Sequence, residues 1–396
     1  MGNKGNDTKP GIDNLVRSAG ALLFRGGTLE SSGGSEPIAD SLLIDAVAGT
    51  IGKLAASQAA DDSGAQAKPK DRLVAKSVVG RAQAALEKVR DKGLRSLSRH
   101  DVSALEIIVY TVGRPALRYR NGRVEVPPNK LGDNSRWFVL VATERENINR
   151  VSGCVGRVGR EQGPVNMAAT GWRVGQEFIV TNRHVARDLV VDRNNPVETW
   201  TTDATKKPYI DFAYTDDTAG PARFNVGELI FCAPEDDVDL AIFRVVAGNI
   251  ALPPAIPIDW SESTVGRTLP AAGDASPAFQ GGEIYAVGHP YRAVASAQTS
   301  LVFEEADGRK RWSPGLVTGV DPQRPIMFHD SSTLAGSSGS CVVGIAGDGR
   351  HVAVGLHYGG KELATNKGSG LGSANYAVAF SRLCKHAAAK FLRGTP

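Results

Sequence analysis

Residues 169–186 read A-T-G-W-R-V-G-Q-E-F-I-V-T-N-R-H-V-A, which places a histidine three residues after an apolar run. That run, E-F-I-V-T, is rich in β-branched residues, which favour the pleated surface of a sheet. We therefore expect a strand that ends just before His184, followed by a loop or a helical turn. A single histidine after a strand is more often structural than catalytic, so the rest of the chain decides its role.

Short strand-like runs recur along the chain from about residue 147. Short apolar runs stand between turn signals, including G-E-L-I-F-C-A (227–233), D-L-A-I-F-R-V-V (239–246), E-I-Y-A-V-G (283–288) and H-V-A-V-G-L (351–356). Regularly spaced short strands of this kind predict a sandwich or a barrel. A helix-like stretch from Val378 to Leu392 follows them.

The first third of the chain has a different periodicity. Apolar residues recur at three- and four-residue steps over 38–59 and 72–99, which predicts helices separated by a polar linker at 61–70. The opposite face of the second segment is basic, which is typical of a solvated surface, with an acidic partner as the alternative. We therefore expect a helical N-terminal region over 1–145 and a β-rich domain over 146–396.

The bulk composition is that of a globular protein. The chain has 396 residues, of which 41% are hydrophobic and 45 are glycine, and this favours a β-rich architecture with many tight turns. The net charge of +4 is mild, so we expect no nucleic-acid partner. Four widely spaced cysteines show no metal-binding pattern, so we expect reduced thiols and no metal: Cys154, Cys232, Cys341 and Cys384.

The sequence shows no secretory or membrane segment. The first ten residues contain no apolar run of the kind that a signal peptide needs. No stretch approaches the ~20 apolar residues that a spanning helix requires. We therefore expect a cytoplasmic protein that has no membrane partner.

Two further segments carry side chains that complement a histidine. In E-D-D-V-D-L-A-I-F-R-V, Asp239 begins an apolar strand, whereas its rivals Asp236 and Asp237 stand in a more polar turn. In T-L-A-G-S-S-G-S-C-V-V, glycines flank Ser338 and let the backbone turn sharply. Each segment taken alone is weak, because most such acids and serines belong to ordinary turns.

Taken together, these residues have the chemistry of nucleophilic catalysis. A serine hydroxyl is a poor nucleophile until a histidine removes its proton, and the histidine needs a carboxylate to fix its tautomer. His184, Asp239 and Ser338 therefore form a candidate catalytic triad. The backbone N–H groups of Gly336 and Ser338 are the candidate oxyanion hole.

The order His, Asp, Ser matches the chymotrypsin arrangement rather than that of subtilisin or of α/β-hydrolases. T-N-R-H-V (181–185), D-V-D-L-A (237–241) and G-S-S-G-S (336–340) resemble the histidine, aspartate and nucleophile motifs of the trypsin-like serine peptidases. G-L-H-Y-G-G (355–360) resembles the strand that pairs with substrate backbone. G-H-P-Y (288–291) is similar to the G-Y-P turn common in bacterial members.

This resemblance implies a mainly β protein: a chymotrypsin-like double β-barrel with a C-terminal helix, preceded by an α-helical N-terminal region. It places the barrels over roughly 146–255 and 256–396, and it implies a serine endopeptidase that needs no cofactor. Ala169, Ser337 and Cys341 depart from the residues usual in the family. None of these departures removes a catalytic group.

The residues around the substrate pocket resemble those of glutamyl endopeptidases. Ser332 stands where a trypsin-like pocket has an acidic base, and Asp330 lies two residues out of register. Thr333 and His357 occupy positions that read an acidic side chain in glutamyl endopeptidases. The resemblance therefore implies cleavage after Glu or Asp, and the alternative is that His357 only packs in the pocket wall. The neighbouring pocket residues are Tyr358 and Gly359.

The expected partner is a protein or peptide substrate. We also expect a regulatory protein partner that binds through residues 1–145, as suits an intracellular bacterial protease in defence or signalling. Two other functions remain open at this point. One is a catalytically silent chymotrypsin-like scaffold, and the other is an esterase that uses the same triad.

Overall fold

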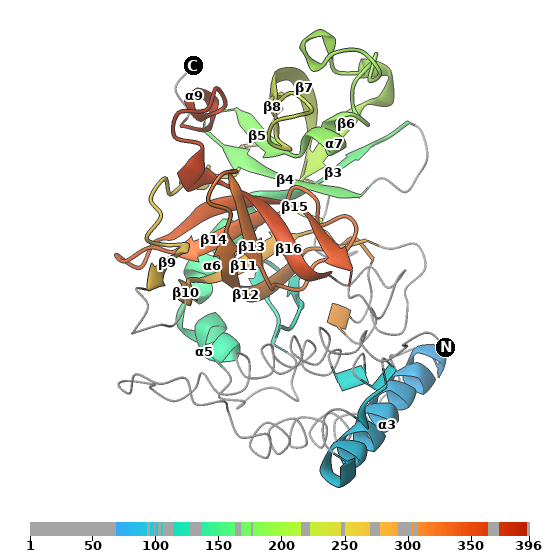
Figure 1. The fold of residues 1–396 in the computed structure, drawn as a ribbon. Helices are drawn as coiled ribbons and strands as arrows, with labels where there is room; N and C mark the ends of the chain where they lie inside the picture. Colours follow the sequence, from blue (N-terminus) through green and yellow to red (C-terminus); the bar gives the residue numbers. More distant parts are fainter. Residues whose placement is uncertain are drawn as a thin grey trace, which may run out of the picture.

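The computed structural model shows two β-barrels packed against each other, with helices and short strands around them (Figure 1). It describes residues 69–92, 96–98, 100–101, 104–105, 114–126, 136–162, 168–175, 177–214, 222–246, 250–269, 278–291, 302–303, 307–362 and 372–393.

The first barrel is closed and antiparallel, with the strand order β3-β4-β5-β8-β7-β6. Its interior is filled by apolar side chains that alternate along the strands, among them Ile179, Ile210 and Phe243, which are fully buried. The strands are β3 (Val155–Arg160), β4 (Ala169–Val174), β5 (Phe178–Thr181), β6 (Pro208–Asp211), β7 (Arg223–Cys232) and β8 (Ala241–Val246).

The second barrel is built in the same way from six strands. Its order is β11-β14-β15-β16-β13-β12, and a pairing of β11 with β12 closes the ring. The strands are β11 (Glu283–Gly288), β12 (Arg311–Val320), β13 (Ile326–His329), β14 (Cys341–Ile345), β15 (His351–Glu362) and β16 (Gly372–Ala379). The double barrel predicted from the sequence is therefore confirmed.

The segment before the first barrel packs on the second one. Strand β1 (Leu117–Arg120) pairs with β12 and, on its other edge, with β2 (Arg123–Val124). Helices α5 (Arg136–Thr143) and α6 (Arg145–Gly153) contribute buried side chains to the core that both barrels share. The division at residue 145 stays a prediction.

Helix α3 (Pro69–Lys92) covers most of the segment predicted as helical over 72–99. The helix predicted over 38–59 and the linker at 61–70 lie outside the described residues, apart from the linker's last two positions, which begin α3. Small elements complete the described chain: α7 (Arg183–Ala186), η3 (Val197–Thr199), η4 (Ala204–Lys206), β9 (Gly266–Leu269), β10 (Ala278–Gly281), η5 (Phe380–Arg382) and α9 (Ala389–Leu392).

The C-terminal helix is much shorter than the predicted stretch from Val378 to Leu392. Strand β16 runs through Ala379, because β13 and β15 supply hydrogen-bond partners for its backbone. The prediction was wrong over this part, and the only helix after the turn η5 in the described chain is α9. This end of the chain crosses back to the first barrel, where Phe391 packs against Phe178 and Phe231.

All four cysteines are described, and none forms a disulfide. Cys154 and Cys341 are buried, Cys232 is half-buried and Cys384 is exposed. Among the helices in the described ranges, none is both long and apolar enough to cross a bilayer.

Candidate active site

His184 and Asp239 meet beside the first barrel. Strand β5 ends at Thr181, and the one-turn helix α7 turns the chain so that His184 faces the start of β8. The imidazole Nδ1 lies 2.6 Å from Asp239 Oδ2, and the backbone N–H of His184 donates to Oδ1 at 3.0 Å. Both carboxylate oxygens therefore hold the same histidine.

The environment of Asp239 favours its charged form. Burial by itself raises the pKa of Asp239, but the hydrogen bonds and charge of His184 outweigh it, and the pKa lies below its ordinary value. The carboxylate then accepts the Nδ1 proton of His184, which leaves Nε2 with a free lone pair. The side chain of His184 is 47% exposed, so this nitrogen is open to a substrate.

The two rival acids lie elsewhere. Asp237 Oδ2 is 2.8 Å from Nε2 of His386, in the segment after the second barrel. Asp236 is exposed in the turn before β8. Of the three acids, only Asp239 has a hydrogen bond with His184 in the described structure.

Arg183 and Asn182 fix the turn that carries the aspartate. The Arg183 guanidinium donates to four carbonyl oxygens of residues 233–238, and Asn182 Nδ2 donates to the Asp239 carbonyl at 2.9 Å. These positioning residues were not found from the sequence. The signal was available, because both belong to the motif T-N-R-H-V.

Ser338 lies on a tight loop between β13 and β14. Gly336 and Gly339 have φ values of +84° and +87°, a conformation that glycine adopts without steric cost. A Cβ at Gly339 would lie 1.8 Å from the Thr170 carbonyl oxygen, so this loop also requires close backbone contact. The sharp turn that the sequence predicted therefore requires glycine at both positions, because of the positive φ values and the close backbone contact.

Thr170 joins this loop to the strands that carry the histidine. Its N–H donates to the Ser338 carbonyl at 2.8 Å, and its hydroxyl donates to the Gly336 carbonyl at 2.9 Å. Its own carbonyl accepts from Thr181 Oγ1 at 2.7 Å, just before His184. Ser338 Oγ has no hydrogen bond to His184 in the described structure, and such bonds are often long before substrate binds.

The candidate oxyanion hole has two free donors. Among the described residues, neither the Gly336 N–H nor the Ser338 N–H has a hydrogen-bond partner. The Tyr291 N–H donates to the Ala335 carbonyl at 2.6 Å. Because a peptide unit is planar and trans, this bond turns the Gly336 N–H to the opposite side. Tyr291, in the G-H-P-Y turn, thus sets the direction of one donor.

His357 has a buried partner that the sequence did not reveal. His329, at the end of β13, places Nε2 3.2 Å from His357 Nδ1, with the rings nearly perpendicular. Burial lowers the pKa of His329 to about 3, and burial, His329 and His184 together lower that of His357 well below its ordinary value. Both rings are therefore neutral near neutral pH, and one of them donates to the other.

The hydroxyl of Thr333 donates to Asn375 Oδ1 at 2.6 Å, while Asn375 Nδ2 donates to the Ser331 carbonyl at 2.7 Å. A carbonyl can only accept, which fixes the orientation of the Asn375 amide. The Thr333 hydroxyl proton is therefore already engaged by Asn375. Asn375 is thus a second partner of the predicted pocket residues that the sequence did not indicate.

The other two predicted pocket residues, Tyr358 and Gly359, lie on β15. Tyr358 is half-buried and stacks on Tyr376, with ring centroids 6.0 Å apart, and Gly359 pairs with the same residue across the sheet. Asp330 and Ser332 both bond to Arg114, which is upstream of the barrels.

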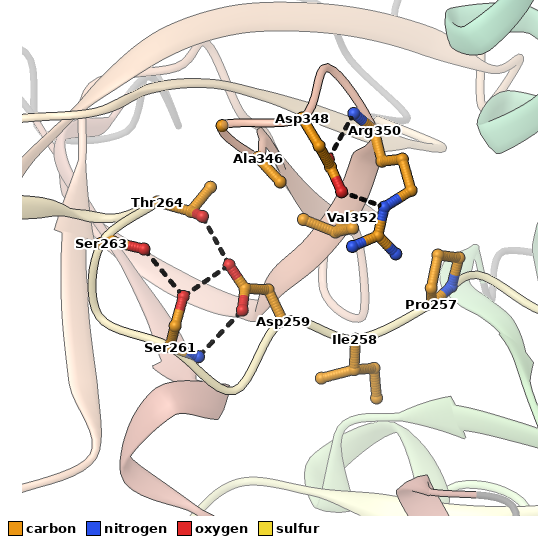
Figure 2. A pocket seen from close by; sticks show the side chains of 11 residues that line it. Pro257, Ile258, Asp259, Ser261, Ser263, Thr264, Ala346, Asp348, Arg350 and Val352 are labelled. Atoms are coloured by element: carbon orange, nitrogen blue, oxygen red, sulfur yellow. Dashed lines mark hydrogen bonds and ion pairs between the residues drawn. The ribbon is translucent and has the colours of Figure 1, made fainter.

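A separate cavity of about 270 Å³ lies at the β14–β15 turn and contains no triad residue (Figure 2). Its central carboxylate, Asp259, already accepts bonds from Ser261 and Thr264, and Arg350 pairs with Asp348. The polar groups that line this cavity therefore satisfy one another.

A family model described as a trypsin-like peptidase domain matches residues 169–354. The solved serine endoprotease from Yersinia pestis is similar at 18% identity and a TM-score of 0.36, over 63% of this chain and 66% of that chain. A protease from M. tuberculosis in its active form is similar at 14% identity and a TM-score of 0.35, over 65% and 87%. This chain thus spans just under two thirds of the Y. pestis protein. No curated protein matched.

Proposed function

We propose that the chain is a serine endopeptidase that uses His184, Asp239 and Ser338, since residues 169–354 match a family model of a trypsin-like peptidase domain. The observation that carries this proposal is the pair of hydrogen bonds from His184 to Asp239, beside the loop that presents Ser338. An imidazole held by a carboxylate at Nδ1 is oriented to act as a base through Nε2.

The chemistry follows from this arrangement. His184 Nε2 takes the Ser338 proton while Oγ attacks the substrate carbonyl, and the N–H groups of Gly336 and Ser338 bind the resulting oxyanion. His184 then gives the proton to the leaving amine, and the peptide bond breaks to leave an acyl-enzyme on Ser338. A water molecule, deprotonated by His184, hydrolyses this ester and returns the serine.

Labelling with a fluorophosphonate tests this proposal directly. We expect the full chain to be labelled and Ser338→Ala to remain unlabelled, with Ser381→Ala, a buried serine after the second barrel, as a matched control for the removal of a hydroxyl. A folded chain that reacts no faster than Ser338→Ala is a scaffold and contradicts the proposal. Digestion of a denatured protein then separates a peptidase from an esterase.

We further propose a preference for Glu or Asp at P1, read by His357. Within the described residues its Nε2 has no hydrogen-bond partner, so a neutral ring that carries its proton there donates to a substrate carboxylate. Thr333 donates as well only if it releases Asn375. Cleavage-site profiling on a peptide library tests this preference, and a profile without acidic residues at P1 contradicts it. His357→Phe should abolish the preference, whereas Tyr209→Phe on the first barrel should leave it unchanged.

We also propose that residues 1–145 regulate this activity in a bacterial cytoplasm, by receiving a protein partner. A truncation that begins at residue 106 removes most of this region and keeps β1, which pairs with β12. We expect the truncated chain to differ from the full chain in its rate or its partners. Equal rates and equal binding would remove the support for a regulatory role.

A further inference from the structure

We propose that Arg114 is a positioning residue that holds the nucleophile loop, residues 330–340, in its active shape. The inference rests on the proposed peptidase function. It makes a short segment upstream of both barrels a working part of the active site, although the family match begins only at residue 169.

The first support is a two-point ion pair. Arg114 Nε donates to Asp330 Oδ1 at 2.7 Å, and Nη2 donates to Oδ2 at 2.6 Å. The Arg114 side chain is 2% exposed and that of Asp330 is 18% exposed, so solvent screens the pair only weakly. Paired donors of this kind fix the plane of the carboxylate as well as its position.

The second support is a further set of hydrogen bonds that fix the first residues of the loop. Ser332 Oγ donates to the Arg114 carbonyl at 2.6 Å, so the backbone and the side chain of one residue hold the loop at two points. Asp330 Oδ1 also accepts from the Leu316 N–H of β12 at 2.7 Å. The start of the loop is therefore fixed between β12 and the upstream segment.

Apolar contacts complete the attachment. Ala116 belongs to one small buried cluster with Leu334 of the loop, and the other members of that cluster are Val302 and Phe303. Besides its ion pair with Asp330, the Arg114 guanidinium also lies over the ring of Trp137 in α5, 5.4 Å from the ring centroid. The arginine is thus supported from two elements while it holds the loop.

The anchored residues lead directly into the chemistry. Thr333 lines the pocket, and the Leu334 N–H bonds to the hydroxyl of Ser337, directly before Ser338. Without Arg114, Asp330 would keep a largely buried charge without this counterion, and the loop would shift to bring that charge to water. Such a shift moves the Gly336 N–H away from the developing oxyanion, so it lowers the rate of acylation.

The test compares Arg114→Ala with wild type by the rate of fluorophosphonate labelling and by kcat and KM on a peptide substrate. We expect labelling and kcat to fall about 10- to 100-fold, as for a small displacement of catalytic groups, with a lesser change in KM. Millimolar guanidinium should restore part of the rate by occupying the vacated site. Arg114→Lys should remain impaired, because an ammonium does not make the two-point contact.

Arg350→Ala is the matched control, since Arg350 pairs with Asp348 at 2.6 Å on the exposed β14–β15 turn. It should label at the wild-type rate. If Arg114→Ala does not fold, Asp330→Asn takes its place, because it removes the charge and keeps the shape. A folded variant at this pair that labels like wild type refutes the inference alone, whereas an unlabelled wild type refutes the proposed function and the inference with it.

Discussion

Acid should destabilise this protein through His329, and the size of the effect follows from its burial. The side chain is fully buried, which lowers its pKa from 6.5 to about 3. As the pH falls below 6.5, the unfolded chain therefore gains a proton at this residue and the folded chain does not. Since the unfolded state binds more protons, the free energy of unfolding falls with falling pH across this window.

The expected loss is about 3 kcal/mol at pH ~4.5, because each of the two pH units below the unfolded-state pKa contributes about 1.4 kcal/mol. Any folded-state pKa of His329 that lies well below pH ~4.5 gives nearly the same loss of unfolding free energy at that pH. His289 and His357 are buried as well, and their pKa values are also lowered, so the whole protein should lose more than this amount.

The variant His329→Gln isolates the contribution, since glutamine still offers a hydrogen-bond partner to His357. Urea unfolding of both proteins, near neutral pH and near pH 4.5, gives the four free energies that are needed. We expect the variant to lose about 2 to 3 kcal/mol less than wild type on acidification. The exposed His100→Gln should behave like wild type. Equal losses in wild type and His329→Gln would refute the reasoning.

Three further outcomes are expected. Asp239→Asn should lower kcat about 10⁴-fold, measured on a peptide substrate, because the amide favours the wrong tautomer of His184. Thr170→Val should slow fluorophosphonate labelling about 10-fold or more, since it frees the Gly336 carbonyl from its donor. Burial lowers the pKa of Lys310 to about 7, so the unfolded state binds more protons above that pH and stability should rise by about 2 kcal/mol between pH ~7 and ~9. Lys310→Met should remove this rise in urea unfolding, and a rise that persists would contradict it.

The sequence was informative about the fold because strands and turns are local. Runs such as E-F-I-V-T and E-I-Y-A-V-G form β5 and β11, and the predicted double barrel is confirmed. The stretch from Val378 to Leu392 was wrongly predicted as one helix, because the residues that its apolar side chains contact are distant in the sequence. Its first residues, Val378 and Ala379, pair with β13 and β15, and its later residues pack against the first barrel, far away in the chain.

The candidate site likewise contains residues that local motifs reveal and residues that only the folded chain brings together. The motifs around His184, Asp239 and Ser338 are short, so their residues could be named from the sequence, and the assignment of the triad stays a prediction. Arg114 is 216 residues away from Asp330 in the chain, and no local pattern links them. His329 and Asn375 likewise contact His357 and Thr333, the predicted pocket residues, only through the closure of the second barrel.

The return of the chain from the second barrel to the first has a consequence for synthesis. His386 bonds to Asp237 in the turn before Asp239, and Phe391 covers Phe178 and Phe231 of the first barrel. A ribosome makes these residues after both barrels, so the first barrel waits for them with an apolar surface uncovered. The turn that carries Asp239 and the start of β5 therefore gain these contacts only when synthesis has passed the second barrel.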